Sequence, residues 1–118
     1  MTGDAVLRYR DGKTERVRID EPDIEHATLH VTKENGQKAD VPFSQLKAVF
    51  FPSPNPAHTY PQEAMAVAVE FADGEVIRGT AQYNPEKNGF FLYPADRSKS
   101  DRIFVVNSAI LSIEVEKL

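Results

Sequence analysis

The chain contains no cysteine and no tryptophan, and none of its apolar runs is long. Without cysteine there is no disulfide framework, no thiolate metal site and no cysteine nucleophile, so a reducing compartment suits the sequence. The longest apolar runs, such as AVFF at 48–51, fall far short of the ~20 residues that a membrane-spanning helix needs, and no signal-peptide pattern is visible. We therefore expect a cytoplasmic protein that does not bind a membrane.

Signatures of catalysis and of metal binding are also scarce. The chain has no phosphate-binding glycine loop and no nucleophile elbow, and no serine has a recognisable base beside it. The histidines are His26, His30 and His58. The first two stand at i and i+4, a spacing that aligns metal ligands on a helix but not on a strand. We expect a protein that is not an enzyme and that holds no cofactor and no metal.

Charge is mildly acidic and evenly spread. The 118 residues are 41% hydrophobic and carry 14 Lys and Arg against 18 Asp and Glu, a net charge of −4. An acidic chain repels nucleic acid unless its basic residues are segregated. Residues 1–51 hold 8 basic and 9 acidic side chains, and residues 64–118 hold 6 and 8. Neither half is basic, which argues against a nucleic-acid partner.

Two stretches of the chain resemble each other. EFADGEVIRGT, residues 70–80, has a weaker counterpart in RYRDGKTERVR, residues 8–18. Apolar positions continue the match at a nearly constant separation: Leu7 with Val69, Tyr9 with Phe71, Leu46 with Ile110, and Val49 with Ile113. We interpret the pattern as a divergent tandem duplication. The alternative is chance similarity between two meandering sheets of similar length.

Each copy has the period-two alternation of half-buried strands. Residues 1–51 form the first copy and residues 64–118 the second, and the segment 52–63 between them contains four prolines, which favour an extended linker. Beside the two hairpins, strands are expected at 27–31, 41–43, 48–51, 90–93, 102–106 and 111–115, with single 3₁₀ turns at 44–47 and 107–110. The sequence therefore predicts an all-β protein of two tandem five-stranded small barrels packed together.

The register of each hairpin depends on the loop at its Asp-Gly pair. A three-residue loop with Gly12 or Gly74 in the left-handed region directs apolar residues inward, whereas a two-residue loop would bury Arg78 beside Val76. We expect the three-residue loop, which points Val17 inward. In the first hairpin the same loop places four arginines on the outer face: Arg8, Arg10, Arg16 and Arg18.

The second copy resembles a family of uncharacterised bacterial domains of the Sm-like or SH3-like small-barrel kind. The resemblance rests on FADGEVIRGT, NPEKNGFFLYPAD and RIFVV and covers roughly the second copy. The first copy matches only at DGK, at the strand around Leu29 and at LKAVFF. The resemblance implies a non-enzymatic module, standing alone or attached to bacterial signalling or surface machinery, and it supplies no ligand and no site residues.

The arginine face is one candidate site. Four guanidinium groups on one side of a hairpin can grip the phosphates of a nucleotide, an RNA or a lipid headgroup. The alternative is an ordinary solvated strand face whose charge is neutralised by nearby carboxylates, among them Glu15, Asp23 and Glu25. We expect the second interpretation to hold.

A second candidate surface lies in residues 83–102. Phe90 and Leu92 should point into the barrel, which sends Phe91 and Tyr93 to the opposite face. With Phe50 these rings either seal an interface between the two barrels or form a recognition patch for another protein or a second protomer. The expected binding residues are Tyr83, Asn84, Phe91, Tyr93, Arg97 and Arg102.

We therefore expect a non-catalytic protein-interaction or regulatory module of a bacterial cytoplasmic system. It would recognise its partner by an edge strand or by the aromatic surface. The alternative function is nucleic-acid or nucleotide binding through the arginine face.

Overall fold

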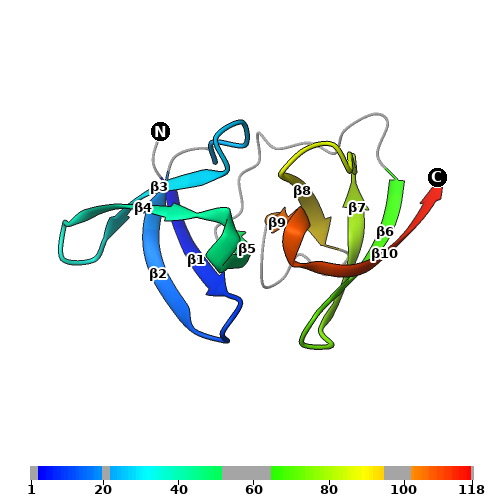
Figure 1. Ribbon diagram of the computed structural model, residues 1–118, viewed down its shortest axis with the longest axis horizontal. Coiled ribbons are helices and arrows are strands. Elements are labelled where there is room, and N and C mark those ends of the chain that lie inside the picture. Colours follow the sequence, from blue (N-terminus) through cyan, green and yellow to red (C-terminus); the bar gives the residue numbers. More distant parts are fainter. Residues whose placement is uncertain (1–2, 20–21, 52–64, 95–101, 118) are drawn as a thin grey trace.

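The structure, a computed structural model, describes residues 3–19, 22–51, 65–94 and 102–117, and these are all-β as predicted (Figure 1). Ten strands and two short 3₁₀ turns follow in the order β1 (Gly3–Tyr9), β2 (Thr14–Ile19), β3 (Thr28–Lys33), β4 (Lys38–Pro42), η1 (Phe43–Gln45), β5 (Leu46–Phe51), β6 (Met65–Phe71), β7 (Val76–Ala81), β8 (Gly89–Pro94), β9 (Arg102–Val106), η2 (Asn107–Ala109) and β10 (Ile110–Lys117). The expected 3₁₀ turns are confirmed, each shorter than predicted. The proposed linker, 52–63, lies outside the described residues.

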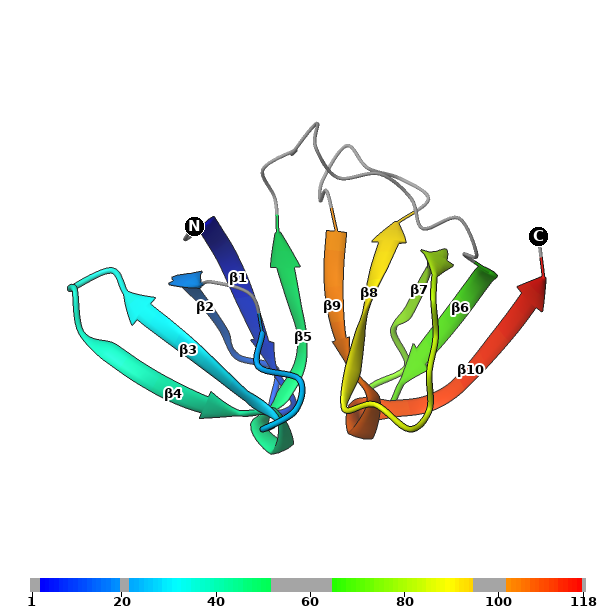
Figure 2. The same ribbon diagram turned by 90° about the horizontal axis from the view of Figure 1, so that it is seen from above.

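All ten strands join one antiparallel sheet, in the order β10-β6-β7-β8-β9-β5-β1-β2-β3-β4. The prediction of two separately closed barrels is therefore not met in the described structure. Each half is a curled, open five-stranded unit, and the two units share a continuous sheet through the pairing of β5 with β9 (Figure 2). The physical reason is that a strand edge left open in each half finds its backbone partner in the other half.

The two hairpin loops have the predicted geometry. Gly12 has φ +94° and Gly74 has φ +91°, in the left-handed region that glycine adopts without strain. Each glycine N–H donates back to the end of the preceding strand, to Tyr9 O at 3.1 Å and to Phe71 O at 2.9 Å. The register follows as expected, because Val17 is buried at 2% exposure.

The two halves bury their apolar residues on opposite faces of the shared sheet. Directly paired residues of an antiparallel sheet place their side chains on the same face, and successive residues alternate. Two neighbouring rows of paired residues run across the middle of the sheet. One row consists of Leu7, Val49, Phe104 and Phe91, and the next consists of Val6, Phe50, Ile103 and Leu92. The fully buried Leu7 and Leu92 therefore point to opposite faces.

The change of face explains why the middle strands are apolar except for Lys47 and Arg102. β5 reads LKAVFF and β9 reads RIFVV, and nearly every residue of both is buried. A strand covered on both faces loses the usual alternation of polar and apolar residues. Phe104 of β9 packs against Phe43 of the first half, with 5.4 Å between the ring centroids. The seam between the halves is therefore part of the core of both.

The same elements recur in both halves. β4, η1 and the start of β5 correspond to β9, η2 and the start of β10 at one constant separation, which matches Lys38 with Arg102 and Leu46 with Ile110. The first hairpin corresponds to the second at a slightly smaller separation, which matches Thr14 with Val76. In each half the fifth strand returns to pair with the first. The two halves thus share one strand order.

Candidate functional site

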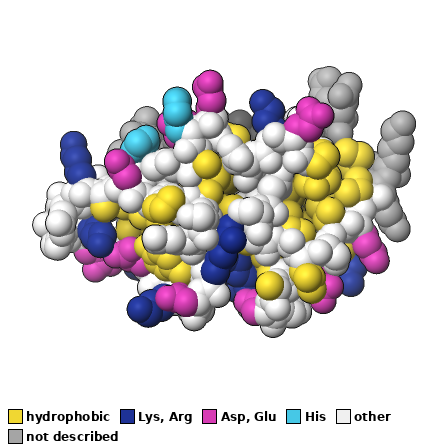
Figure 3. Space-filling view, viewed as in Figure 1, with side chains coloured by type: hydrophobic (Ala, Val, Ile, Leu, Met, Phe, Trp, Pro, Cys, Tyr) yellow, Lys and Arg dark blue, Asp and Glu magenta, His cyan; other side chains and the backbone are white. Residues whose placement is uncertain are grey.

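An open groove lies where the two halves meet at the loop between β7 and β8. Its volume is about 1040 Å³, and its walls are Ile24, Glu25, Met65, Gln82, Tyr83, Asn84, Glu86, Lys87, Asn88, Gly89, Phe90, Phe91 and Tyr93. The first two residues come from the loop before β3 and the others from the second half. We call this feature the aromatic groove. Hydrophobic side chains gather on the second half of the molecule in Figure 3.

The loop that forms one wall of the groove is held by local hydrogen bonds. Asn84 Oδ1 accepts a bond of 2.9 Å from the backbone N–H of Glu86, and the Asn84 carbonyl accepts one of 3.1 Å from Asn107 Nδ2. Asn88 Nδ2 donates to the carbonyl of Ile24 at 2.7 Å, which ties this loop to the first half. The groove therefore has walls fixed by both halves, as binding sites at domain boundaries often do.

The predicted binding residues divide into three groups. Tyr83, Asn84, Phe91 and Tyr93 all line the aromatic groove. Arg102 lies beside it, with its guanidinium 4.2 Å from the centroid of the Phe91 ring. The sixth predicted residue, Arg97, is outside the described residues.

The three predicted rings of the groove differ in how much they contribute to the fold. Phe91 packs edge-on against Phe104 at 5.2 Å and lies 6.1 Å from the ring of Phe51, so it belongs to the seam. Tyr83 rests edge-on against the buried Phe90 at 5.2 Å. Tyr93 is half-buried on β8. The two tyrosines are therefore the rings best placed to meet a partner.

The prediction that Phe50 meets Phe91 across the two halves is wrong by one position. Phe51 meets Phe91, because these two residues lie on the same face of the sheet. Phe50 points to the other face, where the guanidinium of Arg8 stacks on its ring at 4.2 Å.

The four arginines of the first hairpin do not converge on one open site. Arg8 bonds to Glu75 at 3.1 Å. Arg10 donates from Nε to the carbonyl of Leu46 at 2.9 Å, and from Nη2 to the carbonyl of Phe43 at 3.1 Å and to Ser108 Oγ at 2.5 Å. Arg18 is exposed beside Asp4, and Arg16 is exposed. At least two of the four guanidinium groups are thus used to hold the halves together.

Sequence reasoning missed Lys47, the most buried cation among the described residues. Lys47 is 6% exposed, and its Nζ lies 2.7 Å from Asp73 and 2.5 Å from Glu75, at the second hairpin. Burial acts to lower the Lys47 pKa, but the two carboxylates outweigh burial and the pKa is raised. The Lys47 bond in turn lowers the pKa of Asp73, with help from the backbone N–H of Glu75. A single lysine in the apolar run LKAVFF was the available signal.

The cluster around Lys47 borders a smaller hollow of about 490 Å³ lined by Arg8, Tyr9, Gly12, Thr14, Lys47, Asp73 and Glu75. Its cations and carboxylates are already paired with each other. Tyr9 donates to Glu15 Oε1 at 2.8 Å, and burial followed by this bond raises the Tyr9 pKa to about 12. The hollow therefore has no unbalanced charge to attract a ligand.

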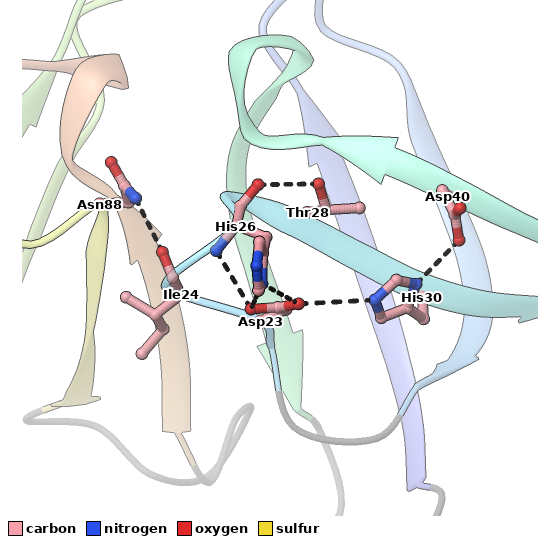
Figure 4. A network of polar contacts seen from close by, with 7 residues as sticks. All are labelled: Asp23, Ile24, His26, Thr28, His30, Asp40 and Asn88. Atoms are coloured by element: carbon pink, nitrogen blue, oxygen red, sulfur yellow. Dashed lines mark hydrogen bonds and ion pairs between the residues drawn. The ribbon is translucent and has the colours of Figure 1, made fainter.

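A chain of histidines and carboxylates holds the loop that contributes Ile24 and Glu25 to the groove (Figure 4). His26 Nδ1 lies 2.9 Å from Asp23, and His30 lies 2.8 Å from Asp40 through Nδ1 and 3.7 Å from Asp23 through Nε2. The Asp40 bond raises the His30 pKa, and the backbone N–H and ring of His26 lower the pKa of Asp23.

The described part of the chain contains neither a metal-binding cluster nor a membrane-spanning helix. No group of three or more His, Asp or Glu side chains there has a geometry that could hold a metal ion. No helix in the same residues is long and apolar enough to cross a membrane.

Comparison with known proteins gives a family and no function. No curated protein and no solved structure is significantly similar to this chain. A family model does match almost its full length, residues 3–117, including both halves of the sheet and the whole aromatic groove. The chain therefore belongs to the family of unknown function DUF6982.

Proposed function

We propose that the protein is a non-catalytic interaction module that binds a segment of a partner protein in the aromatic groove. The observation that carries the proposal is the position of Tyr83 and Tyr93, two half-buried tyrosines on the wall of an open groove. Tyrosine offers a large rigid surface with a polar end, and it is enriched in protein interfaces.

The polar groups of the groove suit a peptide backbone. Asn84, Asn88 and Gln82 bring side-chain amides, while Glu25 and Glu86 bring negative charges and Lys87 a positive one. A wall of aromatic rings with interspersed amides can pack side chains and also pair with main-chain groups. Mixed charge favours a partner segment without a strong charge of its own.

We further infer that each half derives from a small Sm-like or SH3-like barrel and that the halves arose by tandem duplication. The shared strand order supports this inference, as does the constant separation between corresponding elements at the end of each half. The partner site would then lie where the two copies fuse, in a bacterial cytoplasmic protein.

The rival function, nucleic-acid or nucleotide binding through the arginine face, has less support. Arg8 and Arg10 already satisfy acceptors in the second half or in η1. The net charge of −4 also opposes phosphate binding.

The experiment is an affinity capture with matched variants. Tyr83→Ser and Tyr93→Ser remove the rings that face the groove, and Tyr9→Ser removes a half-buried tyrosine that does not line it. A partner captured by the wild type and by Tyr9→Ser, but not by the groove variants, supports the proposal. Its purified complex should weaken tenfold or more with each groove variant, about 1.4 kcal/mol.

Thermal melting of all variants separates lost binding from lost folding. The proposal fails if groove variants that remain folded retain every partner that the wild type captures. It also fails if Tyr9→Ser releases the same partner while the groove variants hold it.

A further inference from the structure

The antiparallel pairing of β5 with β9, the seam between the two halves, indicates how two copies of the chain could pair. It pairs Ala48 with Val105, Val49 with Phe104, Phe50 with Ile103 and Phe51 with Arg102. β5 is the fifth strand of the first half and β9 is the fourth strand of the second half. The seam is therefore a fifth strand of one unit paired with a fourth strand of another.

One strand of each type lies at an outer edge of the described sheet. β4 is the fourth strand of the first half, β10 is the fifth strand of the second half, and these are the two outer strands. Figure 2 places them at opposite sides of the molecule. We propose that β10 of one chain pairs with β4 of a second copy, which repeats the internal seam between molecules.

The correspondence between the halves gives the register of this contact. β9 and β10 map onto β4 and β5, with Arg102 at the place of Lys38 and Ile110 at the place of Leu46. The four pairs of the seam then become Val41 with Ser112, Asp40 with Ile113, Ala39 with Glu114 and Lys38 with Val115. Such a contact joins different surfaces of the two copies. It therefore propagates into a closed ring or a filament rather than ending at a dimer.

Exposed apolar side chains on β10 agree with an edge that a second copy covers. Among the described residues the large hydrophobic side chains that stand exposed are Val76, Leu111 and Val115, at 47%, 64% and 40%. Two of these three lie on β10. The same strand also carries the exposed Glu114, and charge on an edge opposes pairing, so the contact depends on its match to the internal seam.

The other edge limits how far the paired ladder can extend along β4. The N–H of Phe43 bonds back to Ala27 at 2.8 Å, so the nitrogen of Pro42 faces the free edge and offers no donor there. Pro42 stands directly after the last residue of the proposed ladder, Val41. The exposed Lys38 and Asp40 replace the Arg102 and Phe104 of the seam, so the contact between chains is weaker than the seam.

Charge exchange tests the register. Val115→Lys places a lysine opposite Lys38, and like charges directly opposite each other destabilise a strand pair. The double variant Lys38→Glu with Val115→Lys restores an attractive pair. Val76→Lys makes the same chemical change at an exposed valine outside both edges and serves as the control.

Sedimentation velocity from about 10 μM to about 1 mM measures the association. We expect the wild type and Val76→Lys to associate with increasing concentration. Val115→Lys should weaken that association by up to about fivefold, and the double variant should recover it. A wild type that stays monomeric overturns the proposal. So does association that Val115→Lys leaves unchanged, or a folded double variant that does not recover. These outcomes are independent of partner capture by the aromatic groove.

Discussion

Lys47 Nζ in the first half of the chain lies 2.7 Å from Oδ2 of Asp73, at the tip of the hairpin of the second half. The same ammonium group lies 4.8 Å from the centroid of the Phe71 ring. A lysine this buried is rare unless it is paired, because removing its charge from water is costly. The contact holds the tip of the second hairpin against β5.

Lys47→Met should destabilise the protein by about 1–3 kcal/mol, since the carboxylates of Asp73 and Glu75 lose their shared donor while the apolar volume is kept. Urea unfolding measures the change. Lys33→Met is the control, because the Lys33–Glu15 pair at 3.6 Å is partly exposed and worth at most about 1 kcal/mol. Equal effects of the two substitutions would contradict a special role for Lys47.

The Lys47 cluster should also lose stability in acid. The pKa of Asp73 is lowered from 3.8 in the folded protein, so its contribution is present above that value and disappears as the pH falls through the folded pKa. Lys47→Met should flatten this acid limb in unfolding experiments from pH 2 to pH 5. An acid limb of unchanged slope in the variant would assign the effect to other carboxylates.

His30 should titrate above its ordinary pKa of 6.5, because the Asp40 carboxylate accepts its ring hydrogen bond. A raised folded pKa means that the contribution is complete below 6.5 and is lost as the pH rises through the folded pKa. Because the ring is exposed, the effect on stability is small and NMR titration is the right measurement. Asp40→Asn should move the His30 pKa back down; no change would exclude the bond.

Gly79→Ala should destabilise the second half by about 1–3 kcal/mol through overpacking. A Cβ at this position would lie 2.2 Å from the Tyr93 carbonyl oxygen and 2.9 Å from Pro94 Cα, and backbone atoms cannot move aside cheaply. Arg78→Ala, at the neighbouring position, is expected to change stability by less than about 0.5 kcal/mol. A neutral Gly79→Ala would mean that β7 and β8 are further apart than the structure has them.

Local sequence determined the hairpins well. The Asp-Gly pairs, with alternation on both sides, fixed the three-residue loops, the burial of Val17 and the exposure of Arg16 and Arg18. The segments 44–47 and 107–110, which are polar and then apolar, also predicted a short turn before the last strand of each half. These features depend on backbone geometry over short stretches, which is why periodicity and glycine position were sufficient.

The seam was not predictable in the same way. Closing each half into its own barrel and pairing β5 with β9 use the same strands and the same apolar residues. The change of buried face at β5 and β9 depends on contacts between residues far apart in the chain, such as Val49 with Phe104. For the same reason the sequence predicted that Phe50, rather than Phe51, contacts Phe91. The error of one position puts the side chain on the opposite face of the sheet.

The arginines of the first hairpin can either stabilise the fold or bind phosphate, and substitutions distinguish the two roles. Arg10→Ala should lower stability by about 1 kcal/mol, because the Phe43 and Leu46 carbonyls lose a charged donor. Arg16→Glu changes an exposed side chain and should leave stability within about 0.5 kcal/mol. We expect no binding of generic single-stranded RNA at physiological salt by either variant or by the wild type. Micromolar RNA binding by the wild type that falls steeply with salt and is lost in Arg16→Glu would instead establish the arginine face as the functional site, because only phosphate contacts produce that salt dependence.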